Sequence, residues 1–304
     1  MLVRVIFAFT TLFFTACSLY ASEIIGNDHF HTVKSGENIA GISKNYNVPV
    51  RRLLELNNIP GNKELKSGDQ IRLSTDRIVP PHPDNGLVLN LPEYTIYYFR
   101  NGEVAGTYPV AIGKKNWQTP RGGFRIANKV TDPAWKVPPR MARVYNMTDE
   151  IIKPGPENPL GKYWMGLTLP HIGIHSTNKP ESVGLSISHG CIRMYDKDAD
   201  ELYHSIDIGT PGEIIYKPVK TAVRDDSVFL EVHKDIYGIV GDLLKYTNDI
   251  LRKENLTGYI DEEKVKTAVE QKSGIPVKVS ISRIINLGDS PSKSGNGRLW
   301  HTVP

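Results

Sequence analysis

The chain has 304 residues, of which 39% are hydrophobic and 23% charged, a composition typical of two or three globular domains and not of a disordered or fibrous protein. Its 37 Lys and Arg against 33 Asp and Glu give a net charge of +4, without long runs of one sign, which argues against a nucleic-acid-binding protein. Only two cysteines occur, which excludes a disulfide scaffold and disfavours a thiolate zinc module.

The first 21 residues have the pattern of a secretory signal peptide. An apolar run at residues 5–14 follows Arg4 and leads into small residues ending at Ala21. Ten apolar residues are fewer than the roughly 20 that a membrane-spanning helix needs. The sequence therefore predicts export with cleavage after Ala21, and the alternative is lipidation of Cys17, since residues 14–17 loosely resemble a bacterial lipobox.

Residues 29–75 are expected to form a small βααβ domain. A strand at 30–33 is followed by helical patterns at 38–46 and 50–56 and a returning strand at 71–73. Residues 76–85 contain three prolines, which predicts a semi-rigid linker that keeps this domain separate from the rest.

From residue 86 to 219 the pattern is mainly β. Strands are predicted at 87–91, 95–99, 104–110, 124–126, 163–169, 172–176 and 213–216. Asn101-Gly102 predicts a tight hairpin, and Asp196 is expected to cap a helix over 196–206. The proline-punctuated segment 137–161 is expected to be a functional loop or lid.

A small α/β domain is predicted at 225–289. Its elements are helices over 235–253 and 261–272 and a strand over 277–285. Residues 290–304 are expected to form a mobile tail.

The chemistry is concentrated at residues 171–193. Cys191 is the single cysteine once residues 1–21 are removed, it follows His189 and Gly190, and it lies shortly before a helix, where a thiolate is favoured. His175 ends a predicted strand, and the loop between can return Cys191 to its imidazole to form a thiolate–imidazolium pair. Gly190 would let a carbonyl approach closely, and its N–H and that of Cys191 could meet an oxyanion.

A zinc site of His171, His175, His189 and Cys191 is the less favoured interpretation. Catalytic zinc sites more often use His and carboxylate ligands, and no acidic residue that would complete such a set stands beside these histidines. We expect no metal and no cofactor.

The motifs Gly173-Ile174-His175-Ser176-Thr177 and Ser188-His189-Gly190-Cys191-Ile192-Arg193 resemble the YkuD-type L,D-transpeptidase catalytic domain. The resemblance implies a mainly β catalytic domain, a YkuD-type β-sandwich, and places the chain near the ErfK-type periplasmic enzymes of Gram-negative bacteria. It assigns catalysis to Cys191, His175, His189 and Gly190. It assigns substrate binding to Arg193, Ser188 and Ser176.

Residues 29–75 resemble a LysM domain from the opening TVKSGENIAGISKNYNV to the closing LKSGDQIRL. The resemblance implies binding to the N-acetylglucosamine-containing glycan strands of peptidoglycan. By position, the glycan-binding residues are Ser35, Gly36, Glu37, Asn38, Asn58, Ile59 and Pro60.

Together the resemblances imply a periplasmic cell-wall enzyme. Cys191 attacks the diaminopimelate–D-Ala bond of a tetrapeptide stem, and an amine resolves the thioester. The acceptor is diaminopimelate of a second stem, which gives a 3-3 cross-link, or a lysine of an outer-membrane lipoprotein. Carbapenems are expected to acylate Cys191. The alternatives are an L,D-carboxypeptidase or other cysteine hydrolase that uses water, and a non-catalytic wall-binding protein that uses LysM alone.

Overall fold

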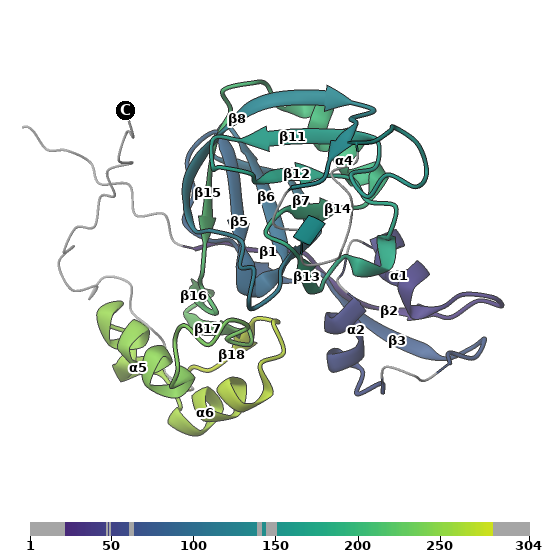
Figure 1. Cartoon of the computed structure of the whole chain (residues 1–304). Helices are drawn as coiled ribbons and strands as arrows, with labels where there is room; N and C mark the ends of the chain where they lie inside the picture. The colour runs from purple at the N-terminus through teal and green to yellow at the C-terminus, as the bar shows by residue number, and fades with distance from the viewer. Residues whose placement is uncertain are drawn as a thin grey trace, which may run out of the picture.

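The computed structural model describes residues 22–46, 48, 50–60, 64–138, 142–143 and 151–281 (Figure 1). The predicted signal peptide, the predicted mobile tail at 290–304 and part of the predicted lid lie outside these residues. Among the described helices, none has the length and apolar character needed to cross a membrane.

The N-terminal unit has the predicted βααβ order. Its elements are β2 (Asp28–Thr32), α1 (Ile39–Tyr46), α2 (Val50–Leu56) and β3 (Gln70–Ser74). Strands β2 and β3 pair antiparallel, α2 packs on β3, and α1 packs on α2. The small core consists of Val33, Ile42, Val48, Leu53, Ile71 and Leu73.

The segment predicted as a linker is partly buried. Strand β4 (Arg77–Ile78) pairs with β1 (Ile24–Ile25), and residues 77–80 are buried. Val79 and Ile25 pack against Tyr97 and Phe99 of the central domain. The first half of the predicted linker is therefore part of the fold, because Ile78 and Val79 directly precede the three prolines and are apolar enough to be buried.

The central domain is one nine-stranded sheet that closes on itself (Figure 1). Its order is β13-β7-β14-β12-β11-β8-β15-β5-β6, and a further β6–β7 pairing closes the ring. The strands are β5 (Gly86–Asn90), β6 (Thr95–Arg100), β7 (Glu103–Gly113), β8 (Gly122–Thr131), β11 (Tyr163–Leu167), β12 (Gly173–His175), β13 (Ser186–Ser188), β14 (Ile192–Met194) and β15 (Pro211–Ile215). The long strand β7 joins the two ends of the sheet, because its first part pairs with β6 and its last residues pair with β14 and β13. The mainly β prediction is confirmed.

Short elements complete the central domain. They are η1 (Leu91–Glu93), β9 (Trp135–Lys136), β10 (Ile151–Ile152), η2 (Pro180–Ser182) and α4 (Asp196–Ser205). The helix predicted at 196–206 is present, but Tyr195 occupies its N-cap, so the predicted cap at Asp196 is one residue too late. Ala199 and Leu202 of α4 pack into the core.

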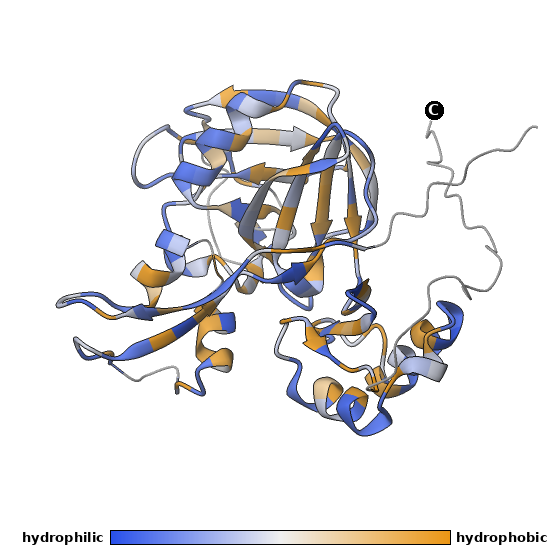
Figure 2. Ribbon diagram, turned by 180° about the vertical axis from the view of Figure 1, so that it is seen from behind, coloured by the Kyte–Doolittle hydropathy of each residue, from blue (hydrophilic) through white to orange (hydrophobic). Residues whose placement is uncertain are grey.

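The predicted hairpin at Asn101-Gly102 is confirmed. Both residues have positive φ, 54° and 79°, as the tight turn between β6 and β7 requires. Figure 2 shows the strands of the barrel carrying many hydrophobic residues.

The C-terminal unit combines a three-stranded sheet with two helices. Its elements are β16 (Val219–Arg224), β17 (Ser227–Val232), α5 (Leu243–Lys253), η3 (Thr257–Tyr259), α6 (Glu262–Gln271) and β18 (Val277–Lys278). Helix α5 buries Leu243, Thr247 and Leu251, which lie on one face. In Figure 2 both helices show blue and orange faces.

Two predictions for this unit need correction. The helix predicted over 235–253 begins only at Leu243, because Gly238 and Gly241 take positive φ and the Asp235 carboxylate accepts N–H groups of the intervening turn. The strand predicted over 277–285 is described only at Val277–Lys278, and residues beyond 281 lie outside the described chain.

Candidate active site

Two neighbouring strands, β12 and β14, present the candidate catalytic residues on one face. Strand β12 pairs in parallel with β14, with Ile174 opposite Ile192 and His175 opposite Arg193. Ile174 and Ile192 point into the core. Because side chains alternate along a strand, His175 and Arg193 lie on the opposite face, and Cys191, two residues before Arg193, projects to the same side.

The imidazole of His175 is buried and held by the backbone. The side chain is 3% exposed, and Nδ1 lies 2.6 Å from the carbonyl oxygen of Ser176. A carbonyl can only accept, so Nδ1 carries the proton in the neutral ring and Nε2 is the basic nitrogen. Burial, aided by the positive charge of Arg193, lowers the pKa of His175 to about 4.

The thiol of Cys191 is half-buried and faces backbone groups. Its Sγ lies 3.5 Å from the carbonyl oxygen of His171, a residue with a φ of 61° in the turn before β12. Burial raises the pKa of the Cys191 thiol, against the lowering effects of the Gly173 backbone and the Arg193 charge. The pKa shifts of His175 and Cys191 both favour the neutral thiol and the neutral imidazole over the thiolate–imidazolium pair that the sequence suggests.

Arg193 is the central charge of the site. Its positive charge acts on His175, His189 and Cys191. Within the described residues its Nε is buried and has no hydrogen-bond partner. A buried guanidinium N–H beside a nucleophile is a donor to which an incoming carboxylate or carbonyl could bind.

The residues before Cys191 form a tight turn. The Ser188 hydroxyl donates to the Cys191 carbonyl and accepts the Gly190 N–H at 3.2 Å. Gly190 has a φ of +114°, and a Cβ there would lie 3.0 Å from Cδ1 of Ile172. Glycine is therefore required at this position by both its backbone angle and its close packing.

Ser176 and His189 differ in accessibility. Ser176 is fully buried, and its Oγ accepts the N–H of Tyr163 at 2.8 Å. His189 is half-buried, and its ring meets the ring of Trp117 edge-on with centroids 4.8 Å apart. Burial first, then the charges of Lys114 and Arg193, lower the pKa of His189.

Trp164 is a site residue that the sequence interpretation missed. Its ring stacks with that of His175 at a centroid distance of 5.9 Å and covers Gly173, where a Cβ would lie 2.4 Å from the indole. The signal was available, because Trp164 alternates with the core residues Tyr163 and Met165 and so had to project from the other face.

Within the predicted lid, the described stretch 151–161 is anchored by Asn158. Its buried amide nitrogen donates to carbonyls of Pro133, Ile152 and Lys153, and its Oδ1 accepts the N–H of Leu160. The Leu160 backbone also contacts the imidazole of His175. The loop is thus tied directly to the candidate base.

The predicted glycan-binding residues lie in two turns of the N-terminal unit. Apart from Glu37 and Ile59, they are exposed. The Glu37 carboxylate accepts from His31 and from the Lys34 N–H, and Asn38 accepts the Gly41 N–H at the start of α1. Backbone and side-chain hydrogen bonds from Lys34 and His31 lower the pKa of Glu37. These two side chains therefore also stabilise the turn.

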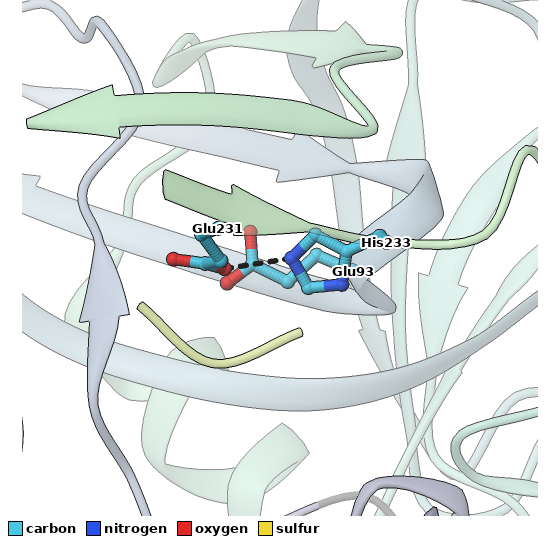
Figure 3. Close-up of side chains that lie close together, drawn as sticks. All are labelled: Glu93, Glu231 and His233. Carbon is cyan, nitrogen blue, oxygen red and sulfur yellow. Dashed lines mark hydrogen bonds and ion pairs between the residues drawn. The ribbon is translucent and has the colours of Figure 1, made fainter. Parts of the chain in front are cut away.

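A second cluster of titratable groups lies where the three units meet. Within the described chain, Glu93, Glu231 and His233 are the side chains close enough together to hold a metal ion (Figure 3). Lys220 already supplies a cation there, with Nζ 2.8 Å from Glu93 and 3.0 Å from Glu231. Although burial opposes ionisation, Lys220 holds the pKa of both carboxyl groups low, so the cluster is a buried ionic contact.

Comparisons with known proteins identify both domains. Residues 84–214 match the L,D-transpeptidase catalytic domain called YkuD, and residues 31–74 match the LysM domain. The chain is 31% identical over 237 residues to "Probable L,D-transpeptidase ErfK/SrfK" of Escherichia coli K12, covering 71% of this chain and 73% of that protein. It is 28% identical over 276 residues to "Probable L,D-transpeptidase YcfS" of the same strain, covering 85% of each.

Among solved structures, the catalytic domain of an E. faecium L,D-transpeptidase acylated by ertapenem aligns with a TM-score of 0.36 and 26% identity. That match covers 45% of this chain and all of the other. From the sequence matches, the chain belongs to the YkuD-type L,D-transpeptidase family and carries an N-terminal LysM domain.

Proposed function

We propose that this protein is a peptidoglycan L,D-transpeptidase with Cys191 as nucleophile. The observation that carries the proposal is the placement of Cys191, His175 and Arg193 on one non-core face of β12 and β14, within the matched catalytic domain. A non-catalytic wall-binding protein would have no use for a buried base and an unpartnered guanidinium nitrogen beside a thiol.

In the first half-reaction the thiol turns from the His171 carbonyl toward His175 as substrate binds. Sγ attacks the carbonyl carbon of diaminopimelate in a tetrapeptide stem, and the thiol proton passes to Nε2 of His175. The C–N bond to D-Ala then breaks, and the imidazolium gives this proton to the departing amine. The product is a thioester between the shortened stem and Cys191.

In the second half-reaction an amine attacks the thioester. Its nitrogen bonds to the acyl carbon, the C–S bond breaks, and the proton lost by the amine returns through His175 to the Cys191 sulfur. The acceptor is diaminopimelate of another stem or a lipoprotein lysine. With water in place of the amine, the same site would act as an L,D-carboxypeptidase.

The neighbouring residues take supporting roles. The Cys191 N–H is assigned as the first oxyanion donor, because the Gly190 N–H must first leave the Ser188 hydroxyl. His189 lies beside this position, and Arg193 is assigned to a carboxylate of the stem. The Ser176 carbonyl orients His175, a role that suits its buried position better than contact with substrate.

The LysM unit is proposed to bind glycan strands of peptidoglycan and so to concentrate stem peptides near the active site. The pattern at residues 1–21 supports export to the periplasm, where this substrate lies, with lipidation at Cys17 as the alternative.

Purified protein incubated with tetrapeptide muropeptides and each acceptor, followed by mass spectrometry, tests the reaction. We expect D-Ala release with a cross-linked or lysine-linked product, whereas tripeptide alone would favour the carboxypeptidase. A carbapenem should add to Cys191 alone. Cys191→Ala should lose both adduct and turnover, and His175→Ala should slow acylation by roughly 10²- to 10⁴-fold. Turnover by Cys191→Ala would overturn the proposal.

A further inference from the structure

A short segment of the C-terminal unit enters the core of the catalytic domain. After β17 the chain turns back at Asp235, whose carboxylate accepts the N–H groups of Ile239, Val240 and Gly241. This turn delivers Tyr237 into the catalytic core, where it is 4% exposed and its ring stacks on Tyr216 with centroids 5.8 Å apart.

The hydroxyl of Tyr237 joins the two ends of one loop. It donates to the carbonyl of Gly113 at 2.6 Å and accepts the N–H of Thr119 at 3.4 Å. The Thr119 hydroxyl in turn accepts the Gly113 N–H at 2.9 Å. The loop 113–119 is also closed by packing, since a Cβ on Gly113 would lie 2.1 Å from the carbonyl oxygen of Trp117.

The same loop holds the residues that precede the nucleophile. Thr119 Oγ1 donates to the carbonyl of Gly190 at 2.8 Å, and the Lys114 N–H donates to the carbonyl of Ser188 at 3.0 Å. Between these two contacts, the ring of Trp117 meets that of His189. The loop therefore contacts Ser188, His189 and Gly190 in turn.

The bond to Gly190 has a direct consequence for Cys191. A peptide unit is planar and trans, so the N–H of Cys191 points opposite to the Gly190 carbonyl. Fixing that carbonyl on Thr119 fixes the direction of the Cys191 N–H, the donor assigned to the oxyanion. Gly190, with a φ of +114°, could otherwise take other backbone angles that tilt this peptide.

We propose that Tyr237 is a positioning residue for catalysis, acting through Thr119 and Gly190 on the oxyanion donor next to Cys191. This inference rests on the proposed function, and it gives the C-terminal unit a part in the reaction. The competing explanation is that the Tyr237 hydroxyl contributes only to stability, as a buried hydrogen bond does.

Tyr237→Phe tests the proposal against a matched control. The change removes the hydroxyl and keeps the buried ring. Tyr98→Phe is the control, because Tyr98 lies in the same core and its hydroxyl also donates to a backbone carbonyl, that of Ser205 at 2.9 Å. Both variants should lose similar stability by thermal unfolding.

Only Tyr237→Phe should lose kcat for D-Ala release from a soluble tetrapeptide, by roughly tenfold with KM unchanged. This is a fraction of the 10²–10³ lost when an oxyanion donor is removed outright. Its kcat–pH profile should keep the wild-type shape, because His175 and Cys191 keep their surroundings. The proposal would be overturned if Tyr237→Phe and Tyr98→Phe had equal kcat, or if the loss of kcat in each variant were proportional to its loss of thermal stability.

Changes at Thr119 show whether Tyr237 acts through it. Thr119→Val should lower kcat, whereas Thr119→Ser, which keeps the hydroxyl, should retain most of the wild-type kcat. The double variant Thr119→Val with Tyr237→Phe should have a kcat only slightly below that of Thr119→Val alone. Additive losses would overturn the route through Thr119. Cys191→Ala in the same assay separates the two proposals. Turnover by Cys191→Ala would contradict the assignment of the nucleophile. No turnover by Cys191→Ala together with wild-type kcat in Tyr237→Phe would contradict only the positioning role of Tyr237.

Discussion

At the residue scale, burial of the site favours neutral forms of its two reacting groups. Burial lowers the pKa of His175 and raises that of Cys191, which favours transfer of the thiol proton during attack over transfer before it. A neutral thiol is also less reactive toward oxidants and stray electrophiles than a standing thiolate. Arg193 opposes the effect of burial on the thiol and adds to it on the imidazole.

The pH dependence of turnover follows from these shifts. With a pKa of about 4, His175 stays neutral and able to accept a proton well below the usual range for histidine, so kcat/KM should hold down to about pH 5 and fall near pH 4. The acid limb of the kcat/KM–pH profile measures this. A limb near pH 6.5 would show that the base is solvated.

Arg193→Gln should move that acid limb upward, because the Arg193 charge helps to lower the pKa of His175. It should also raise the pKa of the Cys191 thiol further, so iodoacetamide should alkylate Cys191 more slowly at pH 8. Arg125→Gln is the control, since the Arg125 guanidinium bonds to the carbonyl of Gly209 and its charge is not among those acting on His175 or Cys191. An identical effect of both changes would contradict the role of Arg193.

Gly190→Ala should cost activity for a reason that can be isolated. The substitution combines an unfavourable φ of +114° with a Cβ 3.0 Å from Cδ1 of Ile172. Gly122→Ala is the control, since Gly122 has a φ of +128° but no atom within 4 Å of such a Cβ. Both should lose about 1–3 kcal/mol of stability by urea unfolding.

Turnover should fall by at least tenfold only in Gly190→Ala, because only that strain tilts the peptide before Cys191. Adding Ile172→Val, which removes Cδ1, should recover part of the loss. If the double variant is no better than Gly190→Ala, backbone strain alone accounts for the defect.

How far the site could be predicted depended on whether its residues were close in sequence. His189, Gly190 and Cys191 are adjacent, and His175 lies within one loop of them, so the motif located them. Thr119 and Tyr237 are far from the motif in sequence and are connected to Gly190 only by the fold. Thr119 lies 71 residues before Gly190, and Tyr237, which bonds to Thr119, comes from the segment after β17. The protonation states were also out of reach, because burial depends on Trp164 and the loop at Leu160, which the motif does not include.

At the element scale, local patterns placed most strands but not their ends or partners. Turn chemistry located the β6–β7 hairpin, since Asn101 and Gly102 favour positive φ. The sequence prediction started helix α5 eight residues too early. Residues 235–242 have apolar residues at helical spacing, but the Asp235 carboxylate accepts backbone N–H groups of this stretch and holds it in a turn. The closure of the sheet by β7 depends on long-range pairing and was not predicted as a ring.

The loop 151–161 gives an element-scale prediction. Asn158 is fully buried, and its amide nitrogen faces three carbonyl oxygens. Asn158→Asp replaces these donors by an acceptor, so it should destabilise the loop by about 1–3 kcal/mol or more. Limited proteolysis within 151–161 should become faster, and turnover should fall because Leu160 contacts His175.

Asn178→Asp is the matched control for Asn158→Asp. Its exposed amide donates to a single carbonyl, that of Pro156 at 3.1 Å, and water can replace this bond. We expect little change in proteolysis or turnover. Equal sensitivity of the two variants would contradict the anchoring role of Asn158.

At the scale of the whole molecule, buried charges join the three units. Lys220 of the C-terminal sheet contacts Glu93 of the barrel, while Glu231 bonds to His233 and to the N–H of Ile78. Arg52 of the LysM unit is buried nearby, and burial lowers its pKa to about 10. Breaking one partner of such a cluster costs more than the pair contributes, because a charge is left buried without compensation.

The carboxylates of this cluster also set a pH dependence of stability. The pKa values of Glu93 and Glu231 are lowered in the folded protein, so their contribution is present above the unfolded value of 4.5 and is lost as pH falls below it. The three units should therefore loosen together in acid.

Two truncations test which part of the N-terminal region is a separable anchor. A chain that starts at Asp76 lacks the LysM unit, Arg52 and strand β1, the partner of β4. It keeps Ile78, whose N–H donates to Glu231 and whose carbonyl accepts from Lys220. The cations Arg77 and Lys220 still face the anions Glu93 and Glu231. This chain should fold and release D-Ala from a soluble tetrapeptide, while its binding to peptidoglycan sacculi falls.

A chain that starts at Gly86 should behave differently, although it removes only ten more residues. It loses the Ile78 N–H that donates to Glu231 and the Ile78 carbonyl that accepts from Lys220. It also loses the packing of Val79 on Tyr97 and the stacking of His82 on Phe99, whose ring centroids are 3.9 Å apart. Unpaired buried polar groups cost about 1–3 kcal/mol each, so urea unfolding should show this chain to be several kcal/mol less stable than the one starting at Asp76. Sacculus binding should be equally weak in both, since neither has LysM. Equal stability of the two chains would mean that residues 76–85 act as a simple linker, and unchanged sacculus binding by either would exclude LysM as the anchor.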